Sequence, residues 1–197
     1  MKRRILFAIK LFLLCAVIQQ LNGQTYNTII SDSVINNLMK HEITTRAKSY
    51  SDSKIWKKKI KSTPTPWSEA IVELISAEYN DFITQKKFII ERDKRYFPKL
   101  KKLTEILSKS DFDYMESQFN SELNNKWNFK TKKGRLRDNP RRKYYSYTIP
   151  LFNKEHSVAL LYSEFGGCSY CGGARMLVYI KKNNTWKLYK SIPLWES

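Results

Sequence analysis

Two cysteines separated by two residues are the first candidates for chemistry in this sequence. Cys168 and Cys171 lie in the stretch FGGCSYCGGARM, each beside a pair of glycines. A pair with this spacing could exchange disulfides, supply half of a metal site or form a structural disulfide. Redox catalysts place such a pair at the start of a helix, whose dipole lowers the pKa of the first thiol. The residues after Cys171, GGARMLVYI, have the composition of a strand. This favours a structural disulfide between Cys168 and Cys171, with thiol–disulfide exchange as the alternative.

The histidines suggest no second reactive centre. Zinc sites need four protein ligands, or three and a water molecule. The chain offers His41 on an expected helix and His156 in an expected turn, with no second close pair of ligands. A cysteine–histidine nucleophile is conceivable. However, the Ser-x-Gly-Cys-x-Arg signature of cell-wall L,D-transpeptidases is not matched, because Arg175 lies four residues after Cys171. We therefore expect no cofactor and no metal, and the sequence favours a protein without enzymatic activity over an enzyme.

A strongly basic segment is the second candidate site. Residues 130–143, KTKKGRLRDNPRRK, carry eight lysines and arginines against the single Asp138, and aromatic residues follow directly from Tyr144. Gly134, Asn139 and Pro140 indicate a loop or broken hairpin. Positive charge beside aromatic rings suits anionic lipid, polysaccharide or an acidic protein, although a solvated linker would have the same composition. The predicted anion-binding residues are Lys130, Lys132, Lys133, Arg135, Arg137, Arg141, Arg142 and Lys143.

The first 23 residues have the layout of a secretory signal peptide. A basic start at Lys2, Arg3 and Arg4 precedes an apolar run that is shorter than the roughly 18 residues of a membrane-spanning helix. We expect cleavage near Gly23 and Gln24 and a location in the periplasm or outside the cell, where disulfides persist. No later stretch is long and apolar enough to cross a membrane. The formal charge of the whole chain, +18, favours anionic partners, and export makes nucleic acid an unexpected one.

The elements that would position these residues divide into two halves. Helical spacing predicts helices in residues 30–39 after the cap candidate Ser31, in residues 65–83, which give the strongest pattern, in residues 100–107 after Pro98, and in residues 110–119 with Ser110 and Asp113 as a capping pair. Residues 51–62 are ambiguous. From residue 144 the chain has strand character, with Asn183 and Asn184 as a hairpin turn and SVALLYSEF as a central strand.

The predicted fold class is α+β. We expect a mainly helical region over residues 24–129 to pack on a small antiparallel sheet of about four strands formed by residues 144–197. The basic loop of residues 130–143 separates these two regions, and all of them form one compact domain after removal of residues 1–23.

The last quarter of the chain resembles a group of exported Bacteroidota proteins that has no established activity. The group shares a Pro-φ-Phe start, a loop rich in cysteine and glycine, a Trp-Lys hairpin and a Pro-x-Trp ending. The residues that carry the resemblance are Pro150, Phe152, Cys168, Cys171, Gly172, Gly173, Trp186, Lys187 and Trp195. It implies export and a shared fold for this part of the chain. The sequence therefore favours an exported binding protein without enzymatic activity. The alternatives are a thiol–disulfide oxidoreductase that uses Cys168 and Cys171, and an inhibitor or immunity-like protein that blocks an acidic protein.

Overall fold

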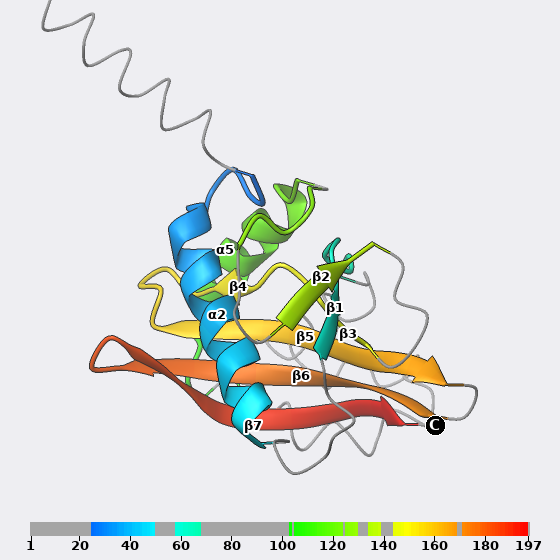
Figure 1. The fold of residues 1–197 in the computed structure, drawn as a ribbon. Helices are drawn as coiled ribbons and strands as arrows, with labels where there is room; N and C mark the ends of the chain where they lie inside the picture. Colours follow the sequence, from blue (N-terminus) through cyan, green and yellow to red (C-terminus); the bar gives the residue numbers. More distant parts are fainter. Residues whose placement is uncertain are drawn as a thin grey trace, which may run out of the picture.

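The fold is a mixed β-sheet with two helices. The computed structural model describes residues 25–49, 58–67, 103, 105–123, 125–129, 134–138, 144–168 and 171–196. Within these ranges the helices are α2 (Asp32–Ser49) and α5 (Lys109–Asn120). Figure 1 shows α2 crossing the long strands, with α5 at the end of the sheet that carries β4.

Seven strands form the sheet. Their order is β2-β1-β3-β5-β6-β7, and β4 pairs with β5 outside this path. Strand β1 runs parallel to both of its neighbours, β2 and β3, whereas the remaining pairs are antiparallel. The bounds are β1 (Lys58–Lys61), β2 (Gly134–Arg137), β3 (Tyr144–Tyr147), β4 (Leu151–Phe152), β5 (Val158–Cys168), β6 (Cys171–Lys182) and β7 (Thr185–Glu196).

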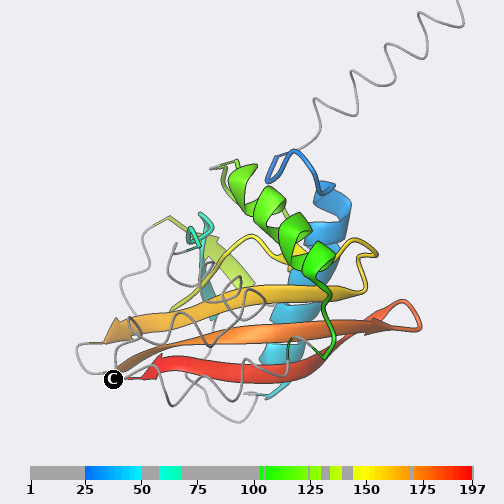
Figure 2. The ribbon, with the colours of Figure 1, turned by 180° about the vertical axis from the view of Figure 1, so that it is seen from behind.

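The sheet buries apolar side chains on both of its faces. Successive residues of a strand point to opposite faces, and β5 accordingly sends Leu161 into one hydrophobic cluster and Leu160 into another. The first cluster contains Ile35 and Leu38 of α2, and the second contains Met115 of α5. Figure 2 shows α5 on the near side of the strands and α2 beyond them. The prediction that SVALLYSEF is a central strand is confirmed, because β5 lies between β3 and β6.

Local signals at turns and helix starts differ in how well they were predicted. Asn183 and Asn184 have φ angles of 48° and 57°, which confirms the predicted hairpin turn between β6 and β7. The capping pair predicted at Ser110 and Asp113 is wrong by two residues. Helix α5 is capped by Ser108, whose side chain accepts from the Asp111 backbone while the Asp111 carboxylate accepts from the Ser108 backbone.

The predicted fold class is wrong. The described residues form a seven-stranded mixed sheet with two helices, and not a helical half packed on an antiparallel sheet of about four strands. The extra strands include β1, from the ambiguous residues 51–62, and β2, from the segment expected to be a basic loop. Each has only four residues, which is too short for periodicity to reveal, and parallel pairing joins segments that are distant in the sequence.

Several predictions fall on parts of the chain outside the described residues. These parts include residues 1–23 and most of the helix expected over residues 65–83, of which Thr65 to Trp67 are described and carry no regular structure. Trp67 is buried, and its indole donates to the Ile149 carbonyl oxygen at 2.8 Å. Neither of the helices described here is long and apolar enough to span a membrane.

Candidate functional site

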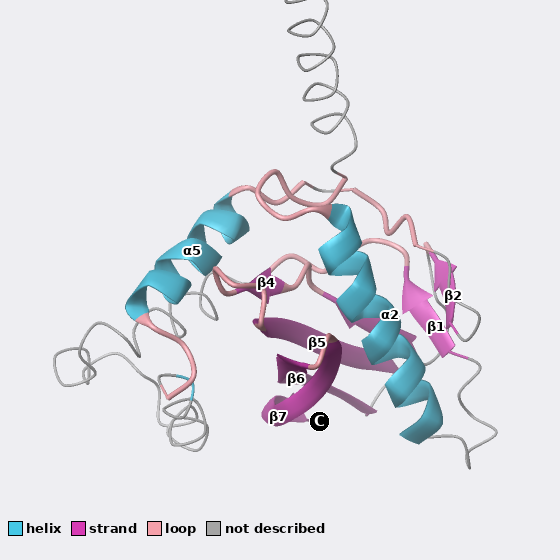
Figure 3. Ribbon diagram, turned by 90° about the vertical axis from the view of Figure 1, so that its left-hand side faces the viewer, coloured by secondary structure: helices cyan, strands magenta, loops and turns pink. Residues whose placement is uncertain are grey.

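The parallel strands β1 and β2 bring basic residues together at one side of the sheet. Lys59 is the register partner of Arg135, and Lys61 is the partner of Arg137. Neighbouring strands lie about 4.8 Å apart, so residues of like charge stand opposite each other twice in the register. We call these four residues, Lys59, Lys61, Arg135 and Arg137, the basic edge. Figure 3 shows β1 and β2 side by side at the margin of the fold.

An apolar row between the basic residues anchors the two strands. Ile60 of β1 is 1% exposed, and its register partner Leu136 of β2 packs against the same hydrophobic cluster. Tyr145 of β3 continues this row on the other side of Ile60. Because strand residues alternate between faces, Lys61 and Arg137 belong to the face opposite this cluster. Lys59 has Tyr144 as its second partner, which places an aromatic residue beside the basic row.

The acidic residue nearest to this row in sequence is already engaged. Asp138 follows β2 and accepts hydrogen bonds from the Ser62 hydroxyl and from Lys126 Nζ, the latter at 2.9 Å. The hydrogen bond from Ser62, together with the one from Lys126 and its charge, lowers the pKa of Asp138. Neither Lys61 nor Arg137 forms an ion pair with an acid in the described part of the chain. The carboxylate of Asp138 therefore does not neutralise the basic edge.

The structure brings together only part of the predicted anion-binding set. Arg135 and Arg137 lie on β2, and Arg137 is exposed. The other predicted residues lie outside the described residues. Lys59 and Lys61 were not predicted. The alternation Lys-Ile-Lys with a buried centre was the available signal, but four residues cannot separate a strand from a helical turn. The residues not described are Lys130, Lys132, Lys133, Arg141, Arg142 and Lys143.

The two cysteines lie opposite each other at the end of a hairpin. Cys168 ends β5, Cys171 begins β6, and the two are register partners. Directly opposed residues of antiparallel strands have Cα atoms about 4.5–5.5 Å apart, within the range that a disulfide bridges. Cys171 starts a strand and not a helix, so the pair lacks the helix start at which redox catalysts place it. The backbone suits the predicted disulfide, which stays a prediction.

The glycines near the cysteines make room for aromatic rings. A Cβ atom on Gly173 would stand 2.7 Å from Phe165 Cε1 and 3.0 Å from the Trp195 carbonyl oxygen. On Gly172 it would stand 3.2 Å from Trp195 Cζ3. This role was not predicted, because the ring packing involves β5 and β7 together. Close packing of Phe165 and Trp195 therefore requires glycine at these positions.

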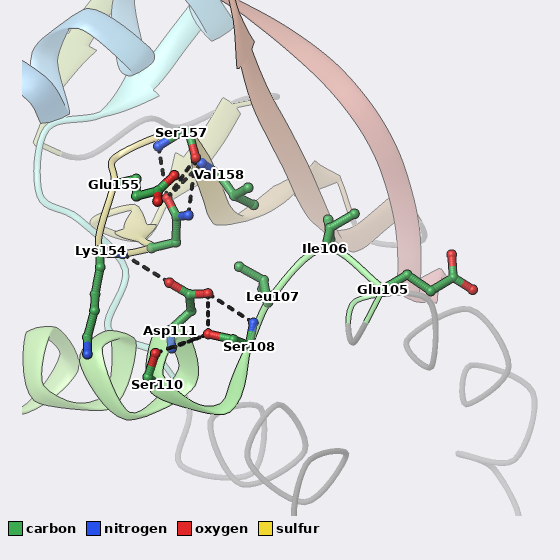
Figure 4. Close-up of a pocket in the computed structure, with 11 residues that line it drawn as sticks. Glu105, Ile106, Leu107, Ser108, Ser110, Asp111, Lys154, Glu155, Ser157 and Val158 are labelled. Carbon is green, nitrogen blue, oxygen red and sulfur yellow. Dashed lines mark hydrogen bonds between the residues drawn. The ribbon is translucent and has the colours of Figure 1, made fainter.

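A shallow groove separates the start of α5 from the turn between β4 and β5. Its volume is about 540 Å³, and Leu107 and Val158 contribute apolar surface to it. Figure 4 shows Asp111 reaching across the groove, where its carboxylate accepts from the Lys154 backbone at 3.2 Å. Burial opposes ionisation of Asp111, but the hydrogen bonds from Ser108 and Lys154 outweigh it and lower its pKa. These bonds fasten the turn to the helix, so the polar groups of the groove serve the fold first.

The two histidines each pack against the ring of a tyrosine. His41 meets the Tyr179 ring edge to face, with centroids 6.1 Å apart, and His156 stacks on Tyr114 at 6.5 Å. Burial lowers the pKa of both, opposed by Glu42 at His41 and reinforced by Lys181 at His156. No group of three histidine, cysteine or acidic side chains could hold a metal ion in the described ranges.

Beside His41, α2 buries a carboxylate in the core. Glu42 is 3% exposed and accepts hydrogen bonds from the hydroxyls of Tyr147, at 3.4 Å, and of Tyr179. The two tyrosines come from β3 and β6, so this polar cluster ties the helix to two strands. Because these hydroxyls satisfy the carboxylate, we assign the cluster a structural role.

Comparison with known proteins adds no relative: no family model, no curated protein and no solved structure matches the chain.

Proposed function

We propose that this protein is exported and acts, without catalysing a reaction, by binding an anionic partner through the basic edge. The observation that carries the proposal is the register of β1 and β2, which sets Lys59 opposite Arg135 and Lys61 opposite Arg137. The signal-peptide composition of residues 1–23 supports export, as does the resemblance of the last quarter of the chain to exported proteins.

Two positive charges opposite each other favour the binding of an anion between them. Two unit charges about 5 Å apart repel by about 0.8 kcal/mol in bulk water, and by several times more near a protein surface. Like charges directly opposite each other in a sheet are destabilising. A phosphate, sulfate or carboxylate placed between Lys61 and Arg137 replaces this repulsion with two attractions. The planar guanidinium of arginine also matches such anions with paired hydrogen bonds.

Protection of the sheet edge explains only half of the arrangement. Charged residues on an edge strand prevent pairing with other sheets, and this reason would account for Arg135 and Arg137 on β2. It does not account for Lys59 and Lys61, because β1 lies inside the sheet between β2 and β3. The lysines of an internal strand need another reason, and anion binding supplies one.

Vesicle binding tests the proposal. The protein should sediment with vesicles that contain anionic phospholipid and not with neutral vesicles. Binding should fall steeply from about 0.1 M to about 1 M salt, because the Debye length falls from about 10 Å to about 3 Å. The double variant Lys61→Glu with Arg137→Glu should bind at least about tenfold more weakly, since it removes two charged donors and each of their hydrogen bonds to an anion contributes about 1.5–3 kcal/mol.

A charge-matched control separates the site from net charge. Lys182 and Lys187 are exposed residues beside the turn between β6 and β7, away from β1 and β2. Changing both to glutamate alters the net charge equally and should leave most of the binding intact. Equal loss in both double variants would refute the basic edge as the site. Saturable binding to an acidic protein, without binding to vesicles, would favour the inhibitor alternative.

Export has its own measurement. N-terminal mass spectrometry of protein from the native cell envelope or medium should find a chain that begins at or near Gln24. Full-length protein with Met1, recovered from the cytoplasm, would contradict export. This result would leave the vesicle test unaffected, so the two parts of the proposal fail separately.

A further inference from the structure

A small cavity lies between three segments of the described chain, and it is lined by none of the four residues of the basic edge. Its volume is about 100 Å³. One wall is the segment that follows β1, another is the segment that follows α5, and Ile149 closes it between β3 and β4. The lining residues are Thr63, Pro64, Thr65, Pro66, Glu122, Leu123, Asn125 and Ile149.

Glu122 is the single titratable residue of this wall. Its Oε1 atom is buried and accepts no hydrogen bond. Its backbone is held on two sides, by a β-bridge to Asn27 and by a hydrogen bond from its N–H to the Phe119 carbonyl oxygen at 3.3 Å. Burial raises the pKa of Glu122 from 4.5 to about 8, and no neighbouring charge offsets this effect. A buried acceptor without a partner costs stability, so this atom calls for an explanation.

The rest of the wall combines oxygen acceptors with apolar surface. Thr63 and Thr65 bring hydroxyls whose oxygens form no hydrogen bond with the described residues, and Asn125 brings an amide whose N–H₂ already donates to the Thr25 carbonyl oxygen at 2.7 Å. Prolines, Leu123 and Ile149 supply the apolar part. A group with several N–H donors and a short hydrocarbon stem would complement such a wall, and an alkylammonium has three donors and no acceptor.

We propose that this cavity binds the end of a primary alkylammonium, with its N–H groups directed to the Glu122 carboxylate and the neighbouring oxygens and its methylenes against the prolines. The volume limits the ligand. A water molecule takes about 30 Å³ in the liquid, so a cavity of about 100 Å³ has room for an aminoethyl group. A free small amine and the lysine side chain of a protein partner share this chemistry.

Binding must release a proton. Near pH 7 the Glu122 carboxyl is mostly protonated, whereas the amine is already an ammonium ion. The complex contains the carboxylate and the ammonium, so one carboxyl proton passes to the solvent and no bond to carbon changes. Affinity should therefore rise with pH until the carboxyl is fully ionised. From a pKa of about 8, we expect roughly a tenfold gain from pH 6 to pH 7 and roughly a fivefold gain from pH 7 to pH 8.

Calorimetric titration with ethylamine tests this inference. Titrations at pH 6, 7 and 8, in buffers with different heats of ionisation, should show these gains and the release of about one proton per amine at pH 7. Glu122→Gln should weaken binding at pH 8 at least about tenfold and remove its pH dependence. Glu155→Gln is the matched control on an exposed glutamate and should behave as the parent.

The outcomes are distinct. No ethylamine binding at pH 8, equal binding by Glu122→Gln, or equal binding of tetramethylammonium, which has no N–H donor, would each overturn the proposal. If ethylamine and a blocked lysine peptide both bind in the Glu122-dependent way, the cavity accepts a protein lysine. If ethylamine alone binds in this way, its ligand is a free amine. Glu122→Gln keeps the size of the side chain and takes away no hydrogen bond from Oε1, which has none, so loss of folding should not obscure the result.

Discussion

The long meander β5-β6-β7 and the short pair β1-β2 belong to one sheet but are stabilised in different ways. The meander strands have 11 or 12 residues and are joined directly along the chain, and their apolar side chains fill clusters on both faces. The β1-β2 pair has four residues in each strand, and Lys59 and Lys61 are paired with Arg135 and Arg137. Burial of apolar side chains stabilises the meander. In the β1-β2 pair, by contrast, the register places positively charged residues opposite each other.

This difference separates residues that maintain the fold from residues available for binding. A substitution in the meander should act on stability, and one in the basic edge should act on binding with little effect on stability. Five measurements test that separation, and we take first those for which we expect the greatest change.

Core truncation should distinguish the two regions most strongly. Leu160 of β5 is fully buried, and Leu160→Ala should lower the free energy of unfolding by about 2–5 kcal/mol, since it removes buried methyl groups and leaves a cavity. Leu136 of β2 is only partly buried, and Leu136→Ala should cost less than about 2 kcal/mol. Urea denaturation of both variants measures the two values. Equal losses would show that the pair is as deeply built into the fold as the meander.

Glu122, which follows α5, should make the free energy of unfolding depend on pH. Its folded pKa, about 8, lies above its unfolded value. The folded state therefore retains a proton that the unfolded state releases, and stability is lost as pH rises from about 4.5 to about 8. Glu122→Gln should be nearly neutral at pH 4.5 and stabilising at pH 9, by up to about 5 kcal/mol. Thermal or urea unfolding at both pH values measures this. A pH-independent effect would mean that the carboxyl titrates normally.

The glycines of the meander should differ in what they tolerate. Gly173→Ala forces the new methyl group against Phe165 and the Trp195 backbone and should cost about 1–3 kcal/mol. Gly166→Ala meets only Tyr144, at 3.5 Å or more, and should be neutral or slightly stabilising because it stiffens the unfolded chain. Comparing the two midpoints of unfolding tests the packing at this end. Similar midpoints would show that the Phe165 ring simply moves aside.

The cysteine pair should add a modest constraint to the same end. If Cys168 and Cys171 are bonded, the loop they close is very short, and Cys168→Ser should lower stability by roughly 2 kcal/mol. Thiol labelling of the unfolded, non-reduced protein should find neither cysteine free. Free thiols in protein from its native compartment would refute the disulfide, and insulin reduction abolished by Cys168→Ser would favour the oxidoreductase.

A small change in stability should accompany a clear change in binding at the basic edge. Lys61→Glu places a carboxylate opposite Arg137, which replaces repulsion with attraction and should stabilise the protein by about 0.2–1 kcal/mol. The same substitution should weaken binding to anionic vesicles. Parallel measurements of unfolding and vesicle sedimentation test both effects. If stability and binding fall together, the basic edge has a structural role and the contrast between the two regions is wrong.

Prediction from sequence succeeded where the signal was local. The Asn183-Asn184 turn and the central position of β5 were predicted, and the structure confirms them. The helix predicted over residues 30–39 is present as part of the longer α2 (Asp32–Ser49). Each depends on residues close together in the chain, through backbone preference or the alternation of apolar side chains. The capping pair of α5 was displaced by two residues, because several serines and aspartates nearby offer the same chemistry.

Composition and local pattern were enough to establish that the chain is rich in basic residues, that its last quarter forms a β-meander, and that two cysteines lie where that meander turns. The parallel pairing of β1 and β2, which places Lys59 and Lys61 beside Arg135 and Arg137, emerged only from the folded chain. The burial of the Glu122 Oε1 atom without a hydrogen-bond partner emerged in the same way. Strand pairing and burial depend on contacts between segments distant in the sequence, whereas composition and periodicity record only neighbours.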